Sequence, residues 1–124
     1  MRVVTAVYGT SHLAYARALV ESLRRVGFTS DTIILVHAEL PAVDGFDTAL
    51  YVNVLEHIGD DIAELVEARK RLVPGGNVVI FVPAMPSLYG TMDEVSGHHR
   101  RYRRAELSAV FAAAGLRTTA IRSF

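Results

Sequence analysis

The sequence "FDTALYVNVLEHIGDD", residues 46–61, contains an apolar run that ends abruptly at Asn53 and is followed by Val-Leu-Glu-His and two aspartates. The run is short and apolar without polar alternation, which is typical of a strand covered on both faces of a parallel sheet. A small amide at the end of such a strand either forms a turn into the next helix or faces a ligand. The sequence leaves both interpretations of Asn53 open.

Similar short apolar segments alternate with stretches of helical periodicity along the chain. Together with the quoted segment they predict strands at residues 2–7, 32–37, 48–52 and 77–82, and a last strand at 116–124. Apolar spacing and capping residues predict helices at residues 11–27, from about 60 to 73 and from about 104 to 114. This alternation is the pattern of an open α/β sheet with helices on both faces.

The strand order follows from the length of one connection. Residues 38–46 are too few for a crossover between neighbouring parallel strands, which predicts that the second and third strands flank the first. The predicted fold is therefore a three-layer α/β sheet of about five mostly parallel strands in the order 2-1-3-4-5. Such sheets bind ligands where the winding direction reverses, at the carboxyl ends of strands one and three. Gly9 and Asn53 are expected at that crevice.

Composition limits the classes of partner. A chain of 124 residues with 51% hydrophobic content buries one core, so residues 1–124 are expected to form a single domain. Thirteen basic and thirteen acidic residues give no net charge, which argues against nucleic acid or an anionic membrane as partner. The absence of cysteine excludes disulfides and thiolate zinc sites. No apolar run reaches bilayer length and no signal peptide is recognised, so a cytoplasmic location is expected.

Residues 46–84, "FDTALYVNVLEHIGDDIAELVEARKRLVPGGNVVIFVPA", resemble the fourth strand, following helix and fifth strand of class I S-adenosylmethionine-dependent methyltransferases. The opening aspartate, "NVLEHI" and "RLVPGG" occur at the spacing of that family. The segment 88–116, "LYGTMDEVSGHHRRYRRAELSAVFAAAGL", resembles the loop and helix of a small-molecule branch. The resemblance covers residues 32–124. It implies a Rossmann-like domain that binds S-adenosylmethionine and holds a small-molecule acceptor under the loop around 84–103.

The amino-terminal part departs from this family. Its first strand normally ends in a carboxylate followed by a glycine-rich loop, because glycine lets the backbone approach the donor. Here "AVYGTSH", residues 6–12, offers a lone Gly9 preceded by Tyr8. The family also has seven strands, so the domain is expected to be incomplete relative to it. The first 27 residues are instead faintly similar to the opening of nucleotide-sugar glycosyltransferases.

The resemblance and the predicted crevice together suggest a donor site. Its candidate residues are Gly9, Thr10, Glu39, Asn53, Val54, Glu56 and His57. Glu39 follows the second strand, where an acid commonly binds ribose hydroxyls or an adenine amino group, although it can equally be a solvated loop acid. Glu56 and His57 can instead be polar groups at a helix start. No metal site is predicted, because neighbouring side chains do not converge as an i, i+4 pair does.

The basic segment "GHHRRYRR", residues 97–104, is the candidate acceptor side. Arginine suits bidentate recognition of phosphate or carboxylate, so an anionic acceptor is expected to contact Tyr89, Arg101 and Tyr102. A base is needed only if the acceptor arrives protonated. His98 is then the first candidate and His99 the second, since imidazole titrates near neutral pH. The alternative is a solvated charged loop before a helix.

Three functional hypotheses follow from these patterns. The first is an enzyme that transfers a methyl group from S-adenosylmethionine to a small molecule. The second is a non-catalytic α/β binding or assembly module that retains the sheet without the glycine-rich loop. The third is a nucleotide-sugar glycosyltransferase-like domain, for which "DGFD", residues 44–47, lacks the Asp-x-Asp spacing of a metal-binding acidic pair.

Overall fold

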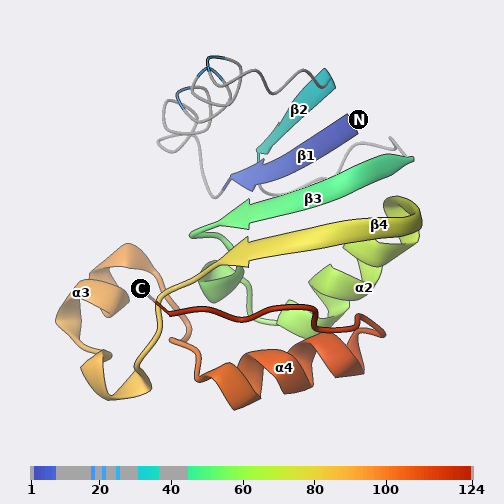
Figure 1. Ribbon diagram of the computed structural model, residues 1–124. Coiled ribbons are helices and arrows are strands. Elements are labelled where there is room, and N and C mark those ends of the chain that lie inside the picture. Colours follow the sequence, from blue (N-terminus) through green and yellow to red (C-terminus); the bar gives the residue numbers. More distant parts are fainter. Residues whose placement is uncertain are drawn as a thin grey trace.

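The computed structural model describes residues 2–7, 18, 21, 25, 31–36 and 45–123. Its sheet consists of β1 (Arg2–Val7), β2 (Asp31–Val36), β3 (Phe46–Val52) and β4 (Leu72–Phe81). All three strand pairings are parallel, and the strand order is β2-β1-β3-β4 (Figure 1). The predicted order is confirmed for these four strands, since β2 and β3 flank β1 instead of forming a hairpin.

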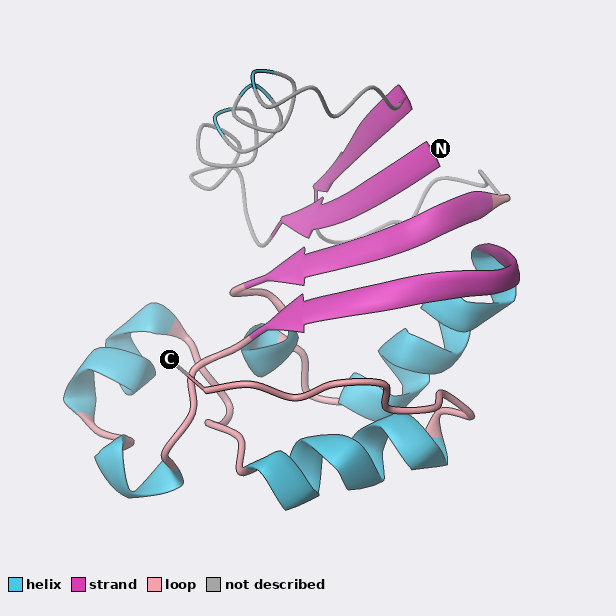
Figure 2. Cartoon of the chain, in the orientation of Figure 1, coloured by secondary structure: helices cyan, strands magenta, loops and turns pink. Residues whose placement is uncertain are grey.

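Two helices lie on the same side of β4, as Figure 2 shows. They are α2 (Asp61–Arg71) and α4 (Arg104–Ala113), and α2 contacts both α4 and β4. The Asp60 side chain caps α2 by accepting a 2.9 Å hydrogen bond from the Ala63 N–H. Both helices agree with their predicted bounds within two residues. None of the described helices combines the length and apolar content needed to cross a bilayer.

Three short helices interrupt segments that were expected to be turns or loops. They are the 3-10 helices η2 (Leu55–His57) and η3 (Pro86–Leu88) and the α-helix α3 (Thr91–Ser96). Gly97 ends α3 with φ 75°, a left-handed conformation that glycine adopts without strain. The segment between β4 and α4 is therefore folded over much of its length.

The predicted helix at residues 11–27 lies largely outside the described residues. Ala18, Glu21 and Arg25 are described, and all three are helical and exposed. Their spacing of three and four residues is that of one face of a helix. The second helical layer of the predicted three-layer fold is thus described at these three positions only, and the rest of it stays a prediction.

The described core lies between β3 and the helices α2 and α4. Apolar side chains from these elements and from η2 are almost completely buried, and they include Phe46, Ala49, Tyr51, Val54, Leu55, Leu65, Ala68, Tyr102, Leu107 and Ala114. The Tyr51 hydroxyl reaches the edge of this core and donates a 2.8 Å hydrogen bond to Glu64 Oε1. Burial of these side chains holds β3 and its following turn against α2.

The Pro74-Gly75-Gly76 segment lies inside β4, not before it as predicted. Helix α2 ends at Arg71 and β4 begins at the next residue. Gly75 has φ 80°, and the pairing of β3 with β4 shifts register between Phe46 and Thr48. A Cβ atom at Gly76 would lie only 2.9 Å from the Val73 carbonyl oxygen and 3.1 Å from that of Asp47. The two glycines therefore permit the bend and the close packing at the start of β4.

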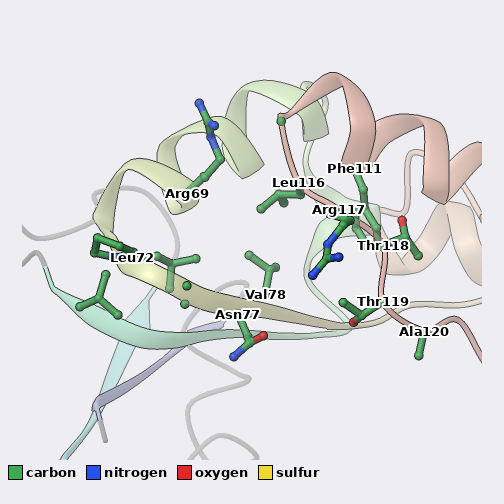
Figure 3. Close-up of a pocket in the computed structure, with 15 residues that line it drawn as sticks. Arg69, Leu72, Asn77, Val78, Phe111, Leu116, Arg117, Thr118, Thr119 and Ala120 are labelled. Carbon is green, nitrogen blue, oxygen red and sulfur yellow. The ribbon is translucent and has the colours of Figure 1, made fainter.

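The prediction of a fifth strand is wrong for the described residues, because 116–123 contain no strand. This segment instead lines two pockets with β4, with volumes of about 470 Å³ and 570 Å³. Figure 3 shows the smaller pocket, where Leu116 lies above Val78 of β4. Val79 and Phe81 are 49% and 52% exposed, so β4 is not covered on both faces. We call β4 and residues 116–123 the open edge.

Candidate functional site

The carboxyl ends of β3 and β4 carry most of the polar side chains singled out in the sequence. Residues 53–60 follow β3 and residues 82–103 follow β4, and we call these two segments the edge loops. Because β1 is followed by β2 on one side and β3 lies on the other, the winding direction reverses between β1 and β3. The crevice expected of such a sheet therefore opens at the end of β3, beside the first edge loop.

Asn53 is the first residue of that loop. Its φ is 50°, a left-handed conformation that asparagine tolerates better than most residues. Its backbone N–H donates a 2.9 Å hydrogen bond to the Phe81 carbonyl oxygen, so the turn is anchored to β4. The side chain is exposed and lines the larger pocket of the open edge. Asn53 thus forms a turn and also presents its amide to solvent, so the two sequence interpretations are compatible.

The other predicted donor-side residues of this loop point into the protein. Val54, Glu56 and His57 are 2%, 0% and 6% exposed. Neither carboxylate oxygen of Glu56 has a hydrogen-bond partner in the described part of the chain, and burial raises the pKa of this carboxyl. Gly9, Thr10 and Glu39 lie outside the described residues. The structure therefore describes only one side of the predicted donor site.

The two edge loops are joined by a network around Asp61. Arg100 Nη1 lies 2.9 Å from Asp61 Oδ2, and the Tyr102 hydroxyl donates a 2.8 Å hydrogen bond to the same oxygen. Arg100 also donates to the carbonyl oxygens of Ile58 and Gly59 at 3.0 Å and 2.7 Å. Burial raises the pKa of Tyr102, so its hydroxyl keeps the proton that it donates. Arg100 and Tyr102 therefore fix the position of the second loop.

A second network centres on Asp93, which is 2% exposed. Its Oδ1 accepts from Arg101 Nε at 2.8 Å and lies 2.9 Å from His98 Nδ1, and its Oδ2 accepts from the Gly90 N–H at 3.1 Å. The hydrogen bond from Arg101 lowers the pKa of Asp93 to about 2, and those from His98 and Gly90 act in the same direction. Asp93 is a carboxylate that the sequence reasoning did not single out.

The structure brings His98 next to the buried Glu56 and His57. The two imidazole rings lie 4.6 Å apart at an interplanar angle of 79°. His98 Nε2 is 3.9 Å from Glu56 Oε1, and His57 Nδ1 is 3.2 Å from the Gly97 carbonyl oxygen. One candidate ligand atom from each of the three residues lies within 4.8 Å of the other two. We call Glu56, His57 and His98 the buried triad.

Of the remaining predicted residues, His99, Tyr89 and Arg101 lie nearer the surface, whereas Tyr102 is 4% exposed. His99 is exposed, and its backbone N–H donates a 2.7 Å hydrogen bond to the Glu56 carbonyl oxygen. Tyr89 is 39% exposed and donates from its hydroxyl to the His98 carbonyl oxygen at 2.8 Å. The second edge loop therefore brings Tyr89, His98 and Arg101 together around Asp93. Tyr102 lies with Asp61 and lines the larger pocket of the open edge.

Solved structures of similar fold exist at low sequence identity. A candidate methyltransferase of Bacillus halodurans C-125 has a TM-score of 0.64 and 18% identity, over 93% of this chain and 53% of that one. The mitomycin 7-O-methyltransferase MmcR has a TM-score of 0.59 and 14% identity, over 96% and 44%. The S-adenosylmethionine-dependent methyltransferase SibL, in its apo form, has a TM-score of 0.54 and 16% identity, over 92% and 43%.

These likenesses establish the fold. The chain has the fold of class I methyltransferases, as its resemblance to that family predicted, and it spans about half the length of the three solved structures. No protein-family model and no curated protein matches the sequence.

Proposed function

We propose that this chain is part of an enzyme that transfers a methyl group from S-adenosylmethionine to a small-molecule acceptor. The observation that carries the proposal is the parallel sheet of order β2-β1-β3-β4, together with the fold that the chain shares with methyltransferases. The three similar proteins are methyltransferases by name, which agrees with this assignment. One fold hosts many activities, so the reaction depends on the side chains of the edge loops.

The described side of the donor crevice fits S-adenosylmethionine. The winding direction reverses between β1 and β3, and the exposed Asn53 amide stands at that point. Its donor and acceptor atoms can bind the polar groups of the cofactor, together with Gly9, Thr10 and Glu39 from the part of the chain outside the described residues. When bound, S-adenosylmethionine supplies an electrophilic methyl group. Val54, Glu56 and His57 support this edge from below, because their side chains are buried.

The acceptor side is assigned to the second edge loop. Methyl transfer requires in-line alignment and exclusion of water, and a loop fixed at both ends can provide both. The loop is held by the Arg100–Asp61 ion pair and by the Tyr102 N–H, which donates a 3.0 Å hydrogen bond to the Pro83 carbonyl oxygen. An anionic acceptor would compete with Asp93 for Arg101, whose side chain is 23% exposed. Tyr89 lies beside it and offers an aromatic contact.

His98 and His99 remain the candidates for a base when the acceptor arrives protonated. Their surroundings differ, because His98 lies between Asp93 and Glu56 whereas His99 is exposed. An exposed imidazole can reach an acceptor held over the sheet without breaking an existing hydrogen bond. His99 is therefore the better candidate for the base, although the sequence analysis placed His98 first.

The test is formation of S-adenosylhomocysteine from S-adenosylmethionine in the presence of a panel of hydroxylated, amino and carboxylated small molecules. Asn53→Gly keeps the left-handed turn but removes the amide, so turnover should fall about tenfold if the amide contacts the donor. Asn77→Ala, an exposed change at the open edge, is the control. If the folded protein forms no more S-adenosylhomocysteine with any acceptor than without one, the result would favour the hypothesis of a non-catalytic binding or assembly module.

A further inference from the structure

We propose that the buried triad of Glu56, His57 and His98 binds one divalent transition-metal ion of the zinc class. The three side chains come from η2 and from the segment after α3, and they converge below the surface of the edge loops. The site does not require the proposed methyl transfer, although it would take His98 from the candidates for the base. It rests on three features of the described residues: the separation of the ligand atoms, the orientation of the imidazole nitrogens and the unpartnered carboxylate.

The separations suit a shared ion. The candidate ligand atoms lie within 4.8 Å of one another, and His98 Nε2 lies 3.9 Å from Glu56 Oε1. In a tetrahedral zinc site with bonds of about 2.0–2.2 Å, neighbouring ligand atoms are roughly 3.3–3.6 Å apart. Side-chain rotations that bring the farthest atoms together by roughly 1–1.5 Å would close the site.

The second nitrogen of His98 is held by a hydrogen bond of the kind that orients metal-binding histidines. Its Nδ1 lies 2.9 Å from Asp93 Oδ1, and this carboxylate also accepts from Arg101 and Gly90. A carboxylate that accepts three hydrogen bonds has no proton to donate, so His98 Nδ1 carries the hydrogen. The neutral ring then presents its lone pair at Nε2, the nitrogen that faces Glu56.

His57 is oriented in the same way. Its Nδ1 lies 3.2 Å from the Gly97 carbonyl oxygen, which can only accept a hydrogen bond. Nδ1 therefore donates in this contact, and Nε2 is the nitrogen that would bind the ion. In both histidines of the triad a contact at Nδ1 orients the ring, which is the outer-shell arrangement that supports metal-binding imidazoles.

Glu56 supplies the strongest indication. The residue is 0% exposed, and both carboxylate oxygens lack a hydrogen-bond partner among the described residues. An ionised carboxylate buried without a partner is strongly unfavourable, and a bound cation is one of the few groups that can compensate it. The two imidazole nitrogens nearby are neutral ligands that would complete the shell of that cation.

The donor set selects the class of metal. Two imidazole nitrogens and one carboxylate suit zinc or a neighbouring first-row ion, whereas magnesium and calcium prefer shells of oxygen. The side chain of His98 is 18% exposed and that of Glu56 is not exposed, so the triad lies nearest to solvent at His98. The ion would tie η2 to the second edge loop, and His98 would then be a ligand, leaving His99 as the base.

The test is calorimetric titration of the untagged, chelator-treated chain with zinc chloride, together with visible absorption after addition of cobalt(II). We expect about one equivalent of zinc, a higher melting temperature with zinc and a cobalt spectrum of low coordination number, with no response to magnesium. Glu56→Gln is nearly isosteric and keeps the fold, and it should weaken zinc binding at least tenfold. Glu94→Gln, an exposed change on α3, should leave it unchanged.

Two results would overturn the proposal. One is a folded wild-type chain that takes up no zinc or cobalt. The other is a Glu56→Gln variant that binds zinc as tightly as the wild type, because the ion would then lie elsewhere. A Glu56→Gln variant that binds no zinc but melts at a higher temperature than the metal-free wild type supports the site. The substitution removes the buried charge and the metal ligand together.

Discussion

The edge loops follow the carboxyl ends of β3 and β4, the open edge runs along β4, and the two regions are held in different ways. At the edge loops, Asp61 of α2 and Asp93 each accept hydrogen bonds from several side-chain or backbone donors, and buried side chains lie between the loops. At the open edge, β4 and residues 116–123 enclose two pockets, and Val79 and Phe81 are about half exposed. The segments at the carboxyl ends of the strands are thus fixed by specific polar contacts, whereas at the open edge no further strand of the described residues pairs with β4.

The largest effect is expected at the network between the loops. Asp61→Ala removes the carboxylate that Arg100 and Tyr102 share, so the Arg100 guanidinium and the Tyr102 hydroxyl lose this acceptor. Allowing for the partial exposure of Arg100, we expect the free energy of unfolding to fall by about 2–3 kcal/mol. Urea denaturation followed by circular dichroism measures this change. A loss below about 1 kcal/mol would mean that the loops are not held by this network.

A smaller effect is expected where β4 begins. Gly76→Ala places a Cβ atom 2.9 Å from one backbone oxygen and 3.1 Å from another, so the strand has to shift. We expect a loss of about 1–3 kcal/mol of stability. Gly59→Ala is the matched control, because a Cβ atom there has no neighbour within 4 Å, and it should change stability by about 0.5 kcal/mol or less. Equal losses in both variants would contradict the close packing at Gly76.

The smallest effect is expected at the open edge, and a pair of identical substitutions tests the contrast directly. Val54 is 2% exposed in the first edge loop, and Val79 is 49% exposed on β4. Val54→Thr buries a hydroxyl and should cost about 1–2 kcal/mol, whereas Val79→Thr should cost no more than about 0.5 kcal/mol. Comparable thermal shifts in the two variants would show that β4 is covered in solution by another part of the protein.

The sequence predicted the sheet well, because short apolar segments mark buried strands whatever the length of the connections between them. The strand order could also be predicted, since the segment 38–46 is too short for a neighbouring crossover. The last strand, 116–124, could not be predicted correctly from apolar content. A strand at a sheet edge forms only if its backbone pairs with the neighbour, and strand preference depends on that context.

The candidate site was predicted less completely than the sheet. The position of Asn53 at the end of β3 was predicted correctly because strand ends are recognisable in sequence and the switch point follows from the strand order, whereas its role stays a prediction. The buried triad was not identified, because Glu56 and His57 do not converge by themselves and His98 joins them only in the folded chain. Both segments, "NVLEHI" and "GHHRRY", belong to the family resemblance, but their contact depends on how the second edge loop folds back. Asp93 was missed for the same reason.

The central claim is that the edge of β1 and β3 binds the methyl donor, and the most direct measurement is isothermal titration calorimetry with S-adenosylhomocysteine. We expect saturable binding of about one equivalent, weakened in Asn53→Gly by about tenfold and unchanged in Asn77→Ala. Circular dichroism confirms that each variant is folded. Absence of binding heat and of any rise in melting temperature, in a folded wild-type chain at millimolar ligand, would contradict the claim.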